Sequence, residues 1–535
     1  MSSLEPSLLR SSTVMAIGTV FSRVTGLIRN LLLVAVLGTT LLGDTYNVAN
    51  TMPNILYNLL LGGSLTAVFV PQLVRATRDS DGGSAFISKL LTATSFILGA
   101  LVIVSVLIAP VLVRIFATGY VGRPEFHLTV LFMRYCLPQI FFMGLFALLG
   151  QIANAKGRFG PMMWAPVLNN LLTITIFGWF LHQSKNLTVT SISFSETTWL
   201  GLGTSAGYVL QTLALIPVIR KTKIKLRLRW DWRDAELRKS FRLASWTLLF
   251  AAISQLSYLV TVNLSTSAAV RAAKAGIATG VGFTPYSNAF LILMLPHSIF
   301  TISIVTALLP ALSLLVLEKK HTEIHDRLVK TIRLVGIITV PSAIAFLLFG
   351  PLITRSLFFG ISHQDAQYLG YTLAGFAFGL LPLSINLIAL RGLNAFENVK
   401  LQVVSNALMN IAAIIFSVVA ALSLPPKWVT VGLAVSLSIS YFFGAWITIR
   451  LLRRYEIFIH IGEIVGLYFK LLLLGFAVAT PLRFALPHLP GGNTLHLLIV
   501  LVVSGLGYIL LAHLFKIEEV ASMLTLLRRK EGSNE

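Results

Sequence analysis

The stretch FSRVTGLIRN (residues 21–30) places Arg23 and Arg29 inside a segment that is otherwise nearly free of charge from about residue 11 to residue 43. A segment of this length can cross a bilayer as a helix. One arginine at the centre of such a helix costs roughly 2.5–3.5 kcal/mol to insert, and an ionisable residue there indicates a functional site. We therefore expect the two arginines to act within the membrane.

The composition of the whole chain predicts a polytopic membrane protein. Of its 535 residues, 56% are hydrophobic and only 12% are charged, whereas a soluble globule carries about 25% charge. The net charge of +22 does not indicate nucleic-acid binding, because no soluble stretch is long enough to form a basic domain. The single cysteine, Cys136, excludes an intramolecular disulfide and a cysteine-based metal cluster. His321 and His325 have metal-compatible spacing, but we expect them to form a solvated face of a charged loop, so no metal site is predicted.

Apolar stretches of about 20 residues predict an all-helical fold with about fourteen transmembrane helices. Their centres lie near residues 25, 57, 100, 138, 170, 208, 253, 297, 344, 379, 410, 440, 474 and 505. Lys and Arg are dense between residues 220 and 242, and they recur in every second connection. By the positive-inside rule these connections are cytoplasmic, and the even number of spans puts both termini on the cytoplasmic side. The recurring residues are Arg75, Arg78, Lys156, Arg158, Lys319, Lys320, Arg327, Lys330, Arg391, Lys400, Arg450, Arg453, Arg454, Arg528, Arg529 and Lys530.

An internal repeat predicts two lobes. NAKGRFGPMMWAPVLNN (154–170) matches NAFENVKLQVVSNALMN (394–410) at an offset of 240 residues, and SLTAVFVP (64–71) parallels SIVTALLP (303–310) near the same offset. Two parallel six-helix lobes, related by an axis along the membrane normal, leave a cavity between them for a substrate. The expected segments are a lobe at 1–220, a basic cytoplasmic loop at 221–240, a lobe at 241–455, two extra helices at 456–517 and a basic cytoplasmic tail at 518–535.

The second predicted span, GDTYNVANTMPNILYN (43–58), carries one polar face. At about 100° per residue, its polar residues fall within roughly 80° of one another. Hydrogen bonds between helices would explain such a stripe. A water-filled lumen explains it better, because the stripe contains an ionisable residue and follows a helix with two arginines. The stripe consists of Asp44, Asn47, Thr51, Asn54 and Asn58.

The two arginines do not share a helical face. Six residues separate Arg23 from Arg29, so their side chains point about 120° apart. One arginine could pair with Asp44 while the other meets an anionic ligand, and the sequence does not decide which. The alternative for each is that it extends to the membrane surface without a role in binding.

These features resemble the MurJ/MviN family of lipid II flippases, which belongs to the multidrug/oligosaccharidyl-lipid/polysaccharide exporter superfamily. The resemblance is densest over residues 21–71 and recurs in ISQLSYLVTVNLS (253–265) and LPHSIFTISIVTALLPALS (295–313). It implies a cationic cavity for a diphosphate and sugar head group, with Arg23, Arg29 and Asp44 at family cavity positions. It also implies that the two C-terminal helices border a groove for the polyprenyl tail.

The chain departs from the family pattern at three places. Tyr57 and Asn58 stand where many members have an arginine pair, and Gly62 and Gly63 stand where they have Glu-Gly. The arginine expected shortly before the proline of the eighth span is missing from NAFLILMLP (288–296). We expect other cations to contribute to the site: Arg271, Lys274 or Arg391.

The predicted function is a flippase that moves lipid II to the outer leaflet of a bacterial inner membrane by alternating access. Its partners would be the polyprenyl-diphosphate-linked sugar, membrane lipids and possible cell-wall synthesis machinery, with no cofactor and no enzymatic activity. A polysaccharide-lipid or drug exporter of the same superfamily is the alternative, followed by a non-transporting cell-wall scaffold. A membrane transferase is disfavoured, because Asp44 is the only acidic residue well inside a predicted span.

The loop charges predict how introduced cysteines respond to an impermeant reagent added outside the cell. Cysteines at Ser80 and Ser240 should be shielded, while one at Asn186 should be labelled. The measurement is labelling in intact cells, with permeabilised cells as the control. Labelling at Ser240 from outside would overturn the predicted order of spans.

Overall fold

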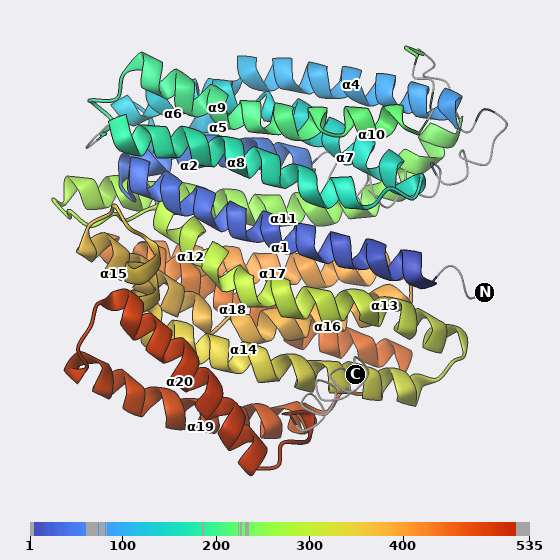
Figure 1. Ribbon diagram of the computed structural model, residues 1–535, viewed down its shortest axis with the longest axis vertical. Helices are drawn as coiled ribbons and strands as arrows, with labels where there is room; N and C mark the ends of the chain where they lie inside the picture. Colours follow the sequence, from blue (N-terminus) through green and yellow to red (C-terminus); the bar gives the residue numbers. More distant parts are fainter. Residues whose placement is uncertain are drawn as a thin grey trace. The chain divides into compact units, whose positions relative to one another are not determined.

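In the computed structural model the regular elements of the described residues are all helices (Figure 1). The structure describes residues 5–59, 73, 81, 83–183, 187–222, 224, 227–229 and 235–520. Contacts divide the chain into two compact units, Met1–Val270 and Arg271–Glu535. The all-helical membrane fold predicted from the sequence is confirmed.

In the first unit, α1 packs along α8, α2 packs on α6, and α9 contacts α6, α7 and α8. The break between α6 and α7 falls at Leu137 and Pro138, because proline removes a backbone donor from the helix, and Pro124–Ala155 still counts as one span. The elements are α1 (Glu5–Leu37), α2 (Leu41–Tyr57), α4 (Ser84–Leu107), α5 (Ala109–Phe116), η3 (Thr118–Tyr120), α6 (Pro124–Cys136), α7 (Gln139–Ala155), α8 (Gly160–Gln183), α9 (Phe194–Leu213), α10 (Ile216–Arg220) and α11 (Ala235–Lys274).

In the second unit, α14 contacts α15, α16 and α19, while α18 packs on α16 and α17. The last helix, α20, packs on α19 and α14. The elements are α12 (Phe283–Pro296), η4 (His297–Thr301), α13 (Ile302–Leu317), α14 (His321–Leu357), α15 (His363–Ala377), α16 (Leu380–Ala395), α17 (Val399–Ser423), α18 (Pro426–Leu452), η5 (Arg453–Tyr455), α19 (Ile461–Ala485), η6 (Leu486–His488) and α20 (Asn493–Leu514).

The number of membrane spans in the described residues is close to the predicted fourteen. Twelve helices are long and apolar enough to cross a membrane, and thirteen if the bent pair α15 and α16 forms one span. The remaining predicted span is the one centred near residue 57. Its helix α2 has 17 residues, about 26 Å at 1.5 Å per residue, and residues 60–72 lie outside the described part of the chain.

The 240-residue offset is visible in the local structure of each unit. Asn154 and Asn394 are the penultimate residues of α7 and α16. Each carbonyl accepts a 2.9 Å hydrogen bond, from the N–H of Gly157 and of Glu397 respectively. Gly157 (φ 74°) and Glu397 (φ 56°) both adopt the left-handed conformation that ends a helix. The second sequence match involves residues 64–71, which lie outside the described residues.

The division by contacts differs in position from the predicted segments. The contact boundary lies after Val270, inside α11, whereas the predicted loop covers residues 221–240 and α11 already begins at Ala235. A contact boundary follows the packing of a helix and does not mark the start of a sequence repeat. The predicted lobe boundaries and the rotation that would relate the lobes stay predictions.

Two glycines allow α14 and α15 to approach closely. A Cβ atom on Gly370 would lie 2.4 Å from both Cα and N of Pro351, and a Cβ on Gly350 would lie 2.5 Å from the carbonyl oxygen of Gly370. These neighbours are backbone atoms, so no side chain can move aside. Helices in membranes commonly pack through small residues in this way, because lipid supplies no hydrophobic force between them.

Gly370→Ala should therefore destabilise the second unit by about 1–3 kcal/mol or more, since the added methyl group forces the two backbones apart. Gly505→Ala in α20 is the matched control, because no heavy atom lies within 4 Å of its Cβ position. The measurement is the Tm of each purified variant in detergent. Equal Tm values for the two variants would contradict this close packing.

Candidate functional site

The apolar segment of α1 contains both predicted arginines. The span Ile17–Leu37 has a mean hydropathy of 1.7, and only 17% of its most apolar window is buried. Arg23 and Arg29 are separated by about 9 Å along the helix axis at 1.5 Å per residue. Neither guanidinium forms an ion pair with a carboxylate of the described residues. The candidate span thus carries two positive charges, which are costly inside a bilayer.

Hydrogen bonds from Asn170 of α8 fix which face of α1 packs against α8. Its Nδ2 donates hydrogen bonds to the carbonyl of Ser22 at 3.1 Å and to Oγ1 of Thr25 at 3.0 Å. Arg29 lies seven residues after Ser22 and is half-buried, whereas Arg23 is exposed. The structure therefore gives the two arginines different surroundings, as their angular separation predicts.

Tyr46 of α2 has a fully buried side chain. The charge of Arg29 contributes to the electrostatic environment of its phenol. Tyr46 also makes an edge contact with Phe132 of α6, with ring centroids 5.3 Å apart. Sequence analysis missed Tyr46, because nothing in the sequence shows which face of α2 packs on α6.

The polar stripe of α2 changes in exposure along its length. Asp44 lies in the first turn, is fully buried and interacts electrostatically with Tyr120. Thr51 is half-buried beside Tyr258 of α11. Farther along, Asn54 is exposed, and Nδ2 of Asn58 donates to its Oδ1.

Asn47 is half-buried, so the stripe opens from a buried carboxyl toward exposed amides. This gradient suits contact with a polar ligand at the exposed end of the stripe. The pairing of Asp44 with an arginine stays a prediction.

The three cations expected to compensate for the missing family arginines lie in different environments. The Nη1 and Nη2 atoms of Arg271 donate to the carbonyl of Ala421 at 3.2 and 3.1 Å, and Lys274 is exposed in the last turn of α11. Arg391 is half-buried in α16, and its buried Nε has no hydrogen-bond partner in the described residues.

A π-helical turn directly follows the segment from which the family arginine is missing. It covers His297–Thr301, directly after Pro296. Nδ1 of the buried His297 lies 3.0 Å from Oγ of Ser384 on α16, and Oγ1 of Thr301 lies 3.3 Å from the same atom. Such turns are frequent at functional sites. Only the Pro-His pair in the sequence hints at this feature.

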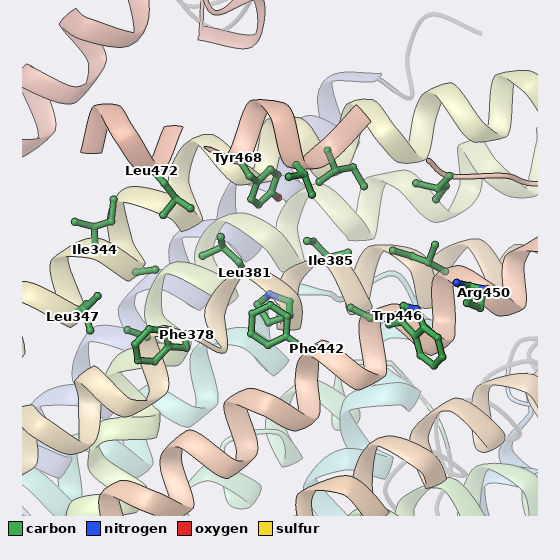
Figure 2. A pocket seen from close by; sticks show the side chains of 18 of the residues that line it. Ile344, Leu347, Phe378, Leu381, Ile385, Phe442, Trp446, Arg450, Tyr468 and Leu472 are labelled. Atoms are coloured by element: carbon green, nitrogen blue, oxygen red, sulfur yellow. The ribbon is translucent and has the colours of Figure 1, made fainter. Parts of the chain in front are cut away.

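An apolar groove of about 540 Å³ lies among α14, α16, α18 and α19 of the second unit (Figure 2). Leu381, Phe442 and Tyr468 contribute to its walls, and nearly all of its lining is apolar. Arg450 and Arg453 lie at its edge, and the guanidinium of Arg450 is 5.2 Å from the ring centroid of Trp446. The lining residues include α19 but none from α20. Of the two C-terminal helices, α19 alone borders this groove.

His321 and His325 are expected from the sequence to lie on the solvated face of a loop. This expectation is wrong, because both residues belong to a helix. Both residues lie in the first turns of α14, and carboxylates approach them. Nδ1 of His321 is 3.5 Å from Glu456, and Nε2 of His325 is 3.2 Å from Glu463. The sequence could not show these contacts, because both carboxylates are more than 100 residues away. No group of three or more metal-binding side chains is found in the described residues.

Comparisons with known proteins agree with this architecture. The family described as "Lipid II flippase MurJ" matches residues 33–501. A "Probable lipid II flippase MurJ" from Haemophilus influenzae is 24% identical over 498 residues, covering 88% of this chain and 91% of the relative.

Two solved structures share the fold. The structure titled "Lipid II flippase MurJ, inward closed conformation" has a TM-score of 0.74 and 19% identity, and the match covers 95% of this chain and 99% of that one. An inward-facing multidrug resistance transporter of the MATE family and MOP superfamily has a TM-score of 0.65 and 13% identity, covering 81% and 95%.

Proposed function

This chain belongs to the MurJ family of lipid II flippases, and on that premise we propose that it moves lipid II from the cytoplasmic to the outer leaflet of the bacterial inner membrane by alternating access. It is a multi-pass membrane transporter and not an enzyme. We further propose that both termini face the cytoplasm, as the loop charges predict, and that cell-wall synthesis proteins use the delivered precursor.

The observation that carries this proposal is the pair of arginines in an apolar helix with no carboxylate partner in the described residues. A guanidinium binds phosphate through charge-assisted hydrogen bonds. Arg23 is exposed and can reach a diphosphate directly, while Arg29 holds its charge beside α8 and α2. A bound anion would lower the cost of both charges within the bilayer.

The amides of α2 extend the site. Asn47, Asn54 and Asn58 offer donors and acceptors suited to a sugar. We assign these groups to the polar head of the substrate.

The groove beside α19 suits the polyprenyl tail. Its walls are apolar and its edge carries Arg450 and Arg453, so a hydrocarbon chain would meet no unpaired polar group along most of its length. Dispersion contacts with Leu381 and Phe442 would hold the tail without requiring it to adopt one specific conformation. The groove is thus compatible with part of a long hydrocarbon chain.

A drug exporter is the second candidate, supported by the fold shared with the MATE-family transporter. The unpaired cations favour an anionic substrate over the cationic drugs that a carboxylate-lined site would select. Depletion of the protein in its own cells distinguishes the two. Lipid II should accumulate on the cytoplasmic leaflet if the chain is a flippase, and should be unaffected if it exports drugs or acts as a scaffold.

Substitution of Arg23 and Arg29 tests whether the site acts through their positive charge. Arg23→Ala and Arg29→Ala should each abolish precursor export, whereas Arg→Lys should retain part of it, because lysine keeps the charge but loses the bidentate fork. Complementation of a depleted strain is measured together with protein abundance. Arg220→Ala is the control, since it removes an exposed charge at the end of α10. Normal export by both alanine variants at normal abundance would refute the proposed role.

Asp44→Asn separates two roles of the buried carboxyl. If Asp44 only neutralises a charge during insertion, protein abundance should fall. If it orients an arginine or gates the transporter, abundance should stay normal while export stops. The same complementation assay reports both quantities.

Leu381→Trp should fill part of the apolar groove and reduce lipid II export several-fold at normal abundance, because the tail loses its space. Leu506→Trp on α20 is the matched control, since Leu506 is 65% exposed on the surface of its helix. Transport of lipid II by purified protein in vesicles is the measurement. Equal rates for the two variants would remove the groove from the proposed path.

A further inference from the structure

A second cavity of about 550 Å³, which we call the α14/α19 pocket, lies at the end of the second unit where α14, α15, α19 and α20 meet. Arg355 lies in the last turn of α14 and Arg483 in the last turn of α19. His488 and His496 also line the cavity, and no aspartate or glutamate does. The pocket is therefore rich in hydrogen-bond donors and positive charge, unlike the apolar groove near Arg450.

Arg355 is held in a fixed position without a carboxylate. Its Nη2 donates to Oε1 of Gln367 at 2.8 Å, and Nε2 of Gln367 donates to Oη of Tyr371 at 2.6 Å. The Nε atom of Arg355 is buried and has no hydrogen-bond partner in the described residues. With Nη2 bonded to Gln367 and Nε buried out of reach, Nη1 of Arg355 is the guanidinium nitrogen that can donate to a ligand in the pocket.

The nearest acidic residue along α15 is occupied elsewhere. Oδ1 of Asp365 accepts from the backbone N–H of Gly280 at 2.6 Å, and Oδ2 accepts from Oγ of Ser362 at 2.8 Å. Neither Arg355 nor Arg483 forms an ion pair within the described residues. The positive charges of Arg355 and Arg483 are therefore available to bind an anionic ligand.

Two more features indicate a phosphate attached to a lipid. The 22-residue helix α20 begins at Asn493, which lines the pocket, and the first N–H groups of a helix favour anions. Apolar residues form the rest of the lining, and Phe484 among them is 72% exposed. A free anion would gain no stabilisation from these apolar residues, whereas the glycerol and first acyl carbons of a phospholipid would pack against them.

We propose that the α14/α19 pocket binds the phosphate of a membrane phospholipid head group. Arg355 and Arg483 contact the phosphate oxygens, and Gln367 is a positioning residue that orients Arg355. The loop charges predict that this end of the helices lies in the outer leaflet. The pocket holds a lipid of the bilayer, not the transported precursor.

The test measures binding of phosphatidylglycerol to the full-length purified protein by native mass spectrometry. Arg355→Gln and Arg483→Gln should each weaken binding by roughly tenfold or more, because each removes charge-assisted hydrogen bonds. Gln367→Leu should weaken it less, and Arg355→Lys should fall between Arg355→Gln and the unaltered chain. Arg220→Gln is the matched control, since it removes an exposed charge at the end of α10 that does not line the pocket.

Equal binding by the control and by both pocket variants, at equal Tm, would overturn the proposal. Soluble pyrophosphate in a separate titration distinguishes the source of the phosphate. Binding of pyrophosphate that depends on Arg355, without any binding of phosphatidylglycerol, would overturn the assignment to a lipid. The assay contains no lipid II, so its result does not depend on the proposed transport function.

Discussion

A bilayer offers no water to a polar group, and this constraint governs every part of the structure. Backbone groups must be bonded within the segment, so the described spans are helices. Polar side chains must find a partner or mark a place where a polar ligand enters. Asn170 meets the constraint by bonding to Ser22 and Thr25, and Ser438 meets it by donating to the carbonyl of Gly375 at 3.0 Å. Arg23 is exposed and has no carboxylate partner in the described residues. Its charge is therefore not neutralised within its own unit.

The sequence predicts the parts of the fold that depend on local chemistry. Hydropathy identifies a span because every residue of the span contributes to insertion. The repeat identifies Asn154 and Asn394 as equivalent because the same turn geometry follows both. The left-handed residue at that turn is Gly157 in one unit and Glu397 in the other, so residue identity alone would not have found it. The backbone shape is shared even where the side chain has changed.

The features that the sequence could not predict depend on contacts between distant segments. Helix geometry gives the angle between Arg23 and Arg29, but only the hydrogen bonds of Asn170 show which arginine turns toward α8. The π-helical turn at His297 depends on Ser384, which is 87 residues away. The apolar groove and the α14/α19 pocket are assembled from several helices each. Apolar residues in a membrane protein look alike in sequence whether they face lipid or a groove.

The cost of the unpaired arginines has a consequence for transport. A ligand shifts a conformational equilibrium only by the difference in its affinity for the two states. Two intramembrane arginines cost roughly 2.5–3.5 kcal/mol each when unpaired, and a diphosphate that neutralises them lowers this cost only in the state that holds it. An apolar tail in a groove gains little on entry, because the surrounding lipid is equally apolar. On the proposed assignment of the arginines to the diphosphate and of the apolar groove to the tail, the head group, and not the tail, supplies the free energy that distinguishes loaded from empty protein. The apolar groove then keeps a long chain in place while the charged end moves.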